Sequence, residues 1–253
     1  MKEDISEVLN SWPFDGSQIN ARLISGDDGQ KKLQLRLDLG IMQMELDGRP
    51  DGLRPEGLDT WFDYYMDRLE EYEDKEGSPD GFCLNAEDCA RLHQEAVQFY
   101  HRYLSLFQLG DWDRVIRDTE RNLGVFEFAS DFAETDELSW MLVQFTPYVL
   151  LMNTRSRAML ALQTGQIKPA LSIIDDGVKK IEEFFLETEN DDFLEHSSEL
   201  KFLKHWRIEL EAMLPVSPHE RLRRQLDEAI AQEDYERAAK LRDQISGIAQ
   251  RES

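Results

Sequence analysis

The sequence predicts a mostly α-helical protein with a small N-terminal antiparallel β segment, a body of repeat-like helical hairpins and a C-terminal antiparallel helical hairpin. Three observations support this fold class. Strict apolar alternation is confined to residues 18–47, and apolar spacings of three and four follow it. The turns between the helical segments resemble one another. Two short amphipathic segments come after PVSP at residues 215–218, where the prolines interrupt helical continuity.

The β segment consists of QINARLIS, the turn GDDG and a longer apolar run. Glycine and aspartate in the turn are typical of a β-hairpin. The next strand is expected to bury Leu33, Leu35, Leu37 and Leu39 on one face and to solvate Gln34, Arg36 and Asp38 on the other. At Gly40 the apolar phase shifts by one residue, so we expect a β-bulge or a sharp bend there, with Met42 and Met44 in the core.

Helical periodicity begins after the glycine- and proline-rich loop DGRPDGLRPEG (Asp47–Gly57). Asn85, with Asp88 three residues later, predicts a capped helix start. Thr146 and Pro147 are interpreted as a cap and a first-turn proline. The expected helices cover an apolar stripe from Trp61 to Tyr72, the segment from Asn85 to Phe107, and the ranges Asp111–Phe128, Thr146–Leu162, Lys168–Leu186 and Asp191–Leu214.

Charge limits the classes of function. The 253 residues carry a formal net charge of −23, which disfavours both nucleic-acid backbones and anionic membranes as partners. Seven basic and eight acidic residues in 219–253 give −1, so the preceding residues carry −22. The uncharged run Leu138–Thr154 is interpreted as a buried helix because it is short and contains Pro147. No secretory signal is visible, and a cytoplasmic protein with the reduced thiols Cys83 and Cys89 is expected.

These patterns predict four parts. Residues 1–80 form an α+β segment with the β-hairpin, and residues 81–214 form the helical body. Residues 215–218 form a linker, and residues 219–253 form the C-terminal hairpin.

Three turns share one design: GDWDRVI, GQIKPAL and EDYERAA. In each, a polar pair separates two helices, an apolar residue follows, and a small or β-branched residue comes three positions later. Asp111 and Asp234 are expected to cap the second helix of the first and third pairs. The first two turns resemble those of tetratricopeptide repeats, although Gly110 and Gly165 lie 55 residues apart, which departs from that family's spacing of about 34. The resemblance implies a repeat-like helical body.

The last segments have coiled-coil-like apolar spacing. An antiparallel hairpin of this size buries little apolar surface, so it needs a second surface. LRRQLDEAIAQEDYERAAKLRDQISGI, and DYERAAKLRD above all, resembles the UVR motif of the excision-repair proteins UvrB and UvrC. That resemblance implies a protein-contact or self-pairing module, which also occurs in McsA-type and ClpC-type stress proteins. The layout is similar to otherwise uncharacterised bacterial UvrB/UvrC-motif proteins. The expected partner-binding residues are Leu222, Leu226, Ile230, Tyr235, Ala238, Leu241, Arg242 and Ile245.

No catalytic, cofactor-binding or metal-binding residues are assigned. The sequence has no phosphate-binding loop of the G-x-x-x-x-G-K-[ST] type and no H-E-x-x-H pattern. Asp47, Asp51 and Glu56 do not follow the order of a calcium loop. Arg49 and Arg54 are interpreted as partners of the excess acids, with a grip on an acidic partner as the alternative.

Three hypotheses about function follow. The first is a non-enzymatic adaptor that binds a protein partner, or a second copy, through the C-terminal hairpin. The second is an accessory factor of excision repair or of a stress protease, which rests on the family resemblance. The third is an enzyme with a site between the β segment and the helices. It requires a concave pocket with buried ionisable groups near Gly40 and the loop Asp47–Gly57.

Overall fold

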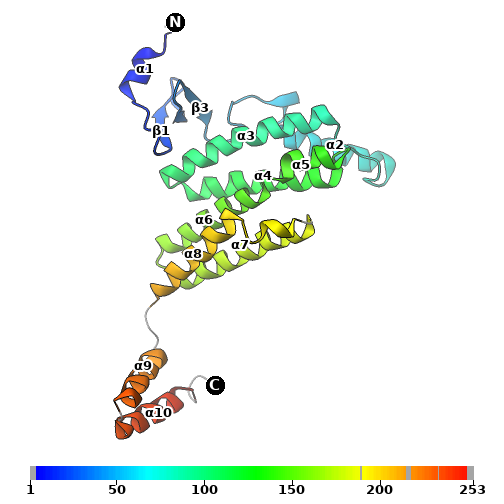
Figure 1. The fold of residues 1–253 in the computed structure, drawn as a ribbon. Coiled ribbons are helices and arrows are strands. Elements are labelled where there is room, and N and C mark those ends of the chain that lie inside the picture. The colour runs from blue at the N-terminus through cyan, green and yellow to red at the C-terminus, as the bar shows by residue number, and fades with distance from the viewer. Residues whose placement is uncertain (1–3, 189, 215–217, 233, 250–253) are drawn as a thin grey trace. The chain divides into compact units, whose positions relative to one another are not determined.

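The computed structural model describes residues 4–188, 190–214, 218–232 and 234–249 (Figure 1). Its mostly α-helical architecture, with a small N-terminal antiparallel sheet, confirms the predicted fold class. The elements are α1 (Ser6–Ser11), β1 (Asn20–Ser25), β2 (Lys31–Arg36), β3 (Ile41–Glu45), η1 (Pro55–Gly57), α2 (Trp61–Glu76), α3 (Ala86–Leu109), α4 (Trp112–Phe132), α5 (Asp136–Val143), α6 (Thr146–Gln163), α7 (Ile167–Glu187), η2 (Asp191–Phe193), α8 (Ser198–Ala212), α9 (Pro218–Ala231) and α10 (Tyr235–Ala249).

Two compact units make up the chain, Met1–Ile208 and Glu209–Ser253, and their boundary falls within α8. We describe each unit by itself. The expected linker at residues 215–218 lies outside the described residues except for Pro218, the first residue of α9. The four-part division stays a prediction. Along the described part of the chain, no helix combines the length and the apolarity that a membrane span requires.

The sheet is an antiparallel meander in the order β1-β2-β3. Leu33 is paired with Leu23 on β1 and with Met44 on β3. The inner face packs against α3, α4 and α6, where Leu33 and Met44 meet Tyr103 and Met152 in one apolar cluster. Met42 is partly buried against the same cluster, so the expectation of core methionines is confirmed.

Two expectations about the second strand were wrong. The chain turns at Gly40, whose carbonyl accepts from Leu37 N at 2.9 Å, so the phase shift marks a second hairpin and a third strand instead of a bulge. Leu37 and Leu39 lie in this turn and are exposed. The second error concerns the polar face of β2, because Gln34 and Arg36 are buried.

Neighbouring polar groups explain that burial. Gln34 accepts from Arg22 Nε and donates to Gln43 Oε1, both at 2.9 Å. Arg36 Nε donates to the carbonyl of Trp12, in the segment that precedes the sheet, at 3.1 Å. Since each buried polar group has a partner, the outer face of the strand can be covered without an unpaired donor.

The predicted helices are present, with several changed boundaries. The Asn85–Asp88 capping box at the start of α3 is confirmed. Thr146 is not the cap of α6, because Phe145 occupies that position and Pro147 lies in the first turn. The uncharged run is divided between α5 and α6. The helix expected from Asp191 begins only at Ser198, after the short η2.

Helical hairpins form at the predicted turns, with α3 beside α4 and α6 beside α7 (Figure 1). Gly110 and Gly165 adopt positive φ angles of 74° and 72°, which glycine tolerates best. Asp111 caps α4 by accepting from Arg114 N, as expected. Trp112 folds back onto Phe107 of α3 with a ring-centroid distance of 5.0 Å.

Two ion pairs cross between α3 and α4 inside the protein. Arg102 of α3 forms a bidentate pair with Asp118 of α4, with N–O distances of 2.7 and 2.8 Å. Arg121 of α4 pairs in turn with Glu95 of α3. Phe99 lies between the two arginines, whose guanidinium carbons are 4.6 and 4.2 Å from its ring centroid. Burial lowers the pKa of Arg121 to about 10, so it stays positively charged at neutral pH.

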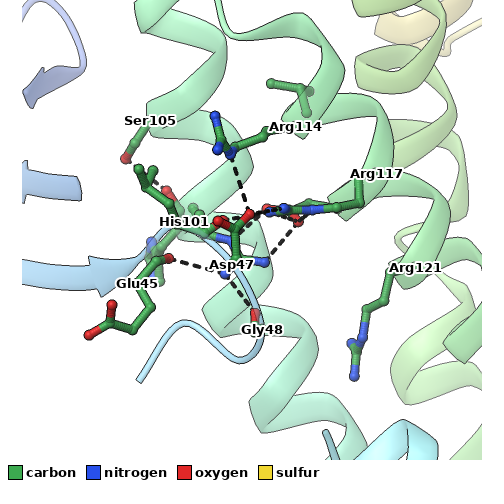
Figure 2. Close-up of polar contacts among 12 residues, drawn as sticks. Glu45, Asp47, Gly48, His101, Ser105, Arg114, Arg117 and Arg121 are labelled. Carbon is green, nitrogen blue, oxygen red and sulfur yellow. Dashed lines mark hydrogen bonds and ion pairs between the residues drawn. The ribbon is translucent and has the colours of Figure 1, made fainter. Parts of the chain in front are cut away.

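The same ion pairs hold other segments in place. Arg102 Nη1 donates to the carbonyl of Gly48 at 2.7 Å and to that of Glu45 at 3.1 Å. Asp47 lies between Arg114 and Arg117, as Figure 2 shows, and Arg117 Nη1 donates to it at 2.6 Å. Glu95 accepts from the backbone N–H groups of Trp61 and Phe62 and thereby caps α2. The loop after the sheet and the start of α2 are therefore both bound to the α3–α4 hairpin.

We expect Asp118→Asn to lower the free energy of unfolding by about 3–5 kcal/mol, because Arg102 would be left as a buried charge without its carboxylate. The matched control is Glu120→Gln on the same helix, which breaks the exposed pair between Glu120 and Arg157 and should cost at most about 1 kcal/mol. Urea unfolding of both variants measures the difference. Equal losses would contradict a special role for the buried pair.

The α6–α7 hairpin gives a second stability prediction. A Cβ atom on Gly177 of α7 would clash with the side chain of Thr154 of α6, so Gly177→Ala must separate the helices and should destabilise the protein by about 1–3 kcal/mol. Gly124→Ala in α4 is the control. Its Cβ would meet Phe62 at 3.4 Å, and it should be neutral or stabilising by up to about 1 kcal/mol. Thermal melts that rank the two variants in the opposite order would refute the assigned close approach.

Candidate functional site

The region considered for an enzyme site contains a polar cavity. It has a volume of about 360 Å³ and lies between the β2–β3 edge and the loop Asp47–Gly57. Gly40 is not among its lining residues. The basic residues that line it are Lys32, Arg49 and Arg54.

Each of these basic residues forms an ion pair. Lys32 pairs with Asp28 at 2.7 Å and with Glu45 at 2.6 Å. Arg54 pairs with Asp59 at 2.8 Å. The geometry therefore agrees with the interpretation of Arg49 and Arg54 as partners of neighbouring acids.

Arg49 is the most buried arginine of this loop. It pairs with Asp51 at 3.1 Å, and its Nε lies 3.5 Å from Glu95 Oε2 without hydrogen-bond geometry. Asp51 also accepts from Gln98 at 2.9 Å. Asp47 and Asp51 therefore face arginine or amide donors. Within the described residues, no group of three or more His, Cys, Asp or Glu side chains is arranged to hold a metal ion.

The two cysteines are free thiols. Cys83 is exposed, whereas Cys89 is buried and its pKa is raised to about 11 by burial. A thiol with that pKa is protonated at neutral pH and is a poor nucleophile.

The C-terminal hairpin consists of α9 and α10, which pack against each other. Its buried centre is formed by Ala229, Ala238 and Leu241, and Leu222 and Leu226 are partly buried against it. Small alanines on both helices allow the helices to approach closely. Four of the predicted partner-binding residues, namely Leu222, Leu226, Ala238 and Leu241, therefore lie in the contact between the two helices.

Two predicted residues are exposed instead. Ile230 is 51% exposed and Tyr235 is 70% exposed. Tyr235 is at the first position of α10. Since Ile230 lies in the last turn of α9, both side chains are at the end of the hairpin that contains the connecting turn.

The last two predicted residues are on α10. Arg242 is exposed and lies beside Asp243, with Nη2 to Oδ1 at 3.1 Å. The side chain of Ile245 lies outside the described part of the structure. The described members of the predicted set are therefore divided between the hairpin's own core and the exposed residues Ile230, Tyr235 and Arg242.

Local hydrogen bonds define the turn of the hairpin. Asp234 accepts from Arg237 N through Oδ1 at 3.1 Å, so the predicted cap is confirmed. The N–H of Asp234 donates to the carbonyl of Ala229 at 2.9 Å. Lys240 pairs with Glu236 one turn earlier at 2.9 Å. The carboxylate of Asp234 and the acidic residue Glu236 suit the positive end of α10.

The comparisons with known proteins concern the same segment. No curated protein and no solved structure matches the chain significantly. A family model described as the UvrB/uvrC motif, UVR, matches residues 217–251, which confirms the predicted resemblance and covers the hairpin of α9 and α10.

Proposed function

We propose that this protein is a non-enzymatic adaptor that binds a protein partner, or a second copy of itself, through the UVR hairpin. The observation that carries the proposal is the exposure of Ile230 and Tyr235 beside a hairpin core in which, among the described side chains, Leu241 is the large one that is nearly fully buried. The match to the UVR family model supports it, because the motif is associated with contacts between proteins.

The energetics of the hairpin support the need for a second surface. Among the described side chains of the hairpin, burying Leu241 contributes about 1.5–3 kcal/mol, and the two alanines and two partly buried leucines add less per residue. Ordering the backbone costs about 1–2 kcal/mol for each residue. A partner that contacts Ile230 and Tyr235 would bury these two exposed apolar side chains. Binding would then stabilise the folded hairpin.

The region near the loop Asp47–Gly57 supports a non-enzymatic role. Lys32, Arg49 and Arg54 all form ion pairs with neighbouring acids, and Asp47 is held between two arginines. The pairs of Asp47 attach the loop to α4, whereas the pairs of Lys32 lie within the sheet and its first turn. An enzymatic site there would require groups that can leave these pairs when a substrate binds.

A second candidate function is an accessory role in excision repair or with a stress protease. The match of residues 217–251 to the UVR motif is the observation that favours it. Tagged protein recovered from cells after ultraviolet damage or heat shock would then copurify with repair or protease subunits. Its recovery without them under both stresses would count against this candidate.

We expect the double substitution Ile230→Asp and Tyr235→Asp in the full chain to weaken self-association or partner binding at least tenfold, because both changes place a charge on the proposed contact. Light scattering and pull-downs with the full-length protein measure the effect. The matched control is Ile208→Asp on α8, where the isoleucine is 63% exposed and lies outside the UVR segment.

Circular dichroism of each variant reports whether the helices persist. If the double variant keeps its helices, its mass and its partners, the hairpin end is not the contact and the proposed function fails.

A further inference from the structure

Two adjoining cavities lie in the helical body. The first, of about 370 Å³, lies between α3, α4 and α6 and is lined mostly by apolar side chains, among them Tyr100, Phe126 and Val149. The second, of about 600 Å³, lies between α5, α6, α7 and η2. Phe145 and Tyr148 line both cavities and so form a common wall.

Aromatic rings line the second cavity and the wall that it shares with the first cavity. Trp140 is 42% exposed, Phe145 46% and Phe193 57%. The exposed rings are held by neighbours: Trp140 is stacked on Phe184 at 6.5 Å, and Phe193 on Phe185 at 6.3 Å. A hollow with several exposed aromatic side chains in fixed orientations is typical of a binding surface.

The lining of this hollow contains a carboxylate and two histidines, His93 and His101. Among the described residues that line the two cavities there is no lysine or arginine, and the carboxylate that lines them is Glu199. The hydroxyls of Ser197 and Ser198 donate to Glu199 at 2.9 and 3.2 Å, and both donors are neutral. Burial lowers the pKa of His101, so this lining imidazole is uncharged at neutral pH. Arg155 of α6 is not a lining residue and lies over the rings of two phenylalanines, at 4.5 Å from each centroid, but its charge also acts on Tyr148 of the common wall.

Two further acids lie on the helices that enclose the second cavity. Asp136 precedes the lining residue Trp140 by four positions on α5. Glu187 follows the lining residue Phe184 by three positions on α7. Residues three or four positions apart are neighbours on one face of a helix, so both acids lie beside the aromatic lining. By the same spacing Lys180 lies beside Phe184 on α7, where it pairs with Asp176 at 2.9 Å. Within the described part of the chain, none of Asp136, Glu187 and Glu199 forms an ion pair.

We propose that this hollow binds a basic segment of another protein, which inserts two large apolar side chains, one into each cavity. The shared aromatic wall separates two adjoining volumes, which suits two side chains of one chain better than one compact ligand. Burial of the anchors supplies affinity, and lysine or arginine beside the anchor in the second cavity faces Asp136, Glu187 and Glu199. This proposal does not depend on the role of the C-terminal hairpin.

Selection of random twelve-residue peptides on phage against the full-length protein provides the test. We expect enriched peptides to carry a net positive charge and at least two large apolar residues. A fluorescein-labelled synthetic copy is then titrated with the protein and its variants.

Phe145→Asn tests the common wall and should weaken binding of the peptide at least tenfold. Phe145 is the N-cap of α6 and its side chain makes no cap hydrogen bond, and asparagine is a favoured N-cap residue, so the helix should persist. The control is Phe14→Asn, which changes a phenylalanine that is 40% exposed and does not line either cavity. It should leave binding unchanged.

Glu187→Gln and Glu199→Gln test the charges. Each should weaken peptide binding about two- to five-fold at low salt, and the effect should shrink as salt is added. Glu70→Gln, which removes the same charge at an exposed position of α2, is the control and should leave binding unchanged.

Three outcomes would overturn the proposal. In the first, the selection enriches no peptide. In the second, the enriched peptides are acidic. In the third, Phe145→Asn and Phe14→Asn weaken peptide binding equally. A synthetic peptide of residues 217–251 is the second probe. If it binds and Phe145→Asn abolishes that binding, the occupant is the protein's own UVR segment and not a basic segment of another protein.

Discussion

The crossed ion pairs between α3 and α4 are the constraint on which the arrangement of the helical body depends. Glu95 and Asp118 are fully buried, and a buried carboxylate is tolerated only with an opposite charge and hydrogen bonds. Each pairs with an arginine on the other helix, so sliding one helix along the other would leave both acids unpaired. Arg102 and Glu95 also form hydrogen bonds with backbone groups of the loop after β3 and of the start of α2. The sheet, the loop and α2 thus derive their positions from one cluster.

The two compact units are stabilised differently. The unit that contains the sheet has a large aromatic core and buried charges, so disrupting a single pair within it leaves an unpaired charge. Among the described side chains, the buried centre of the UVR hairpin consists of Ala229, Ala238 and Leu241, and Asp234 caps α10 at the turn. A segment with a weak core responds strongly to any contact that adds burial. Under the proposed function, this difference suits the hairpin to ordering on a partner and the helical body to a preformed surface.

Charge also differs along the chain. The residues before His219 carry a net charge of −22, whereas the remainder carries −1. Many acids of the body are paired with arginines inside it, whereas Asp136, Glu187 and Glu199 around the aromatic hollow form no ion pair with the described residues. An apolar hollow with such carboxylates at its edge attracts basic segments and repels acidic ones. Under the two proposals, surfaces of different electrostatic character serve two kinds of partner.

The sequence by itself determined the features that depend on neighbours along the chain: the fold class, the helical segments, the caps at Asn85, Asp111 and Asp234, and the UVR motif. These follow from backbone hydrogen bonding and apolar periodicity, which are local. Contacts across the fold decided the rest. Gln34 and Arg36 resemble residues of a solvated face and are buried because partners from other segments cover them. Arg102 and Asp118 resemble surface charges until the two helices pack, and Phe145 and Tyr148 form a wall only where the helical pairs meet. Burial of a polar or aromatic side chain is set by residues distant in sequence, so only the tertiary structure could reveal it.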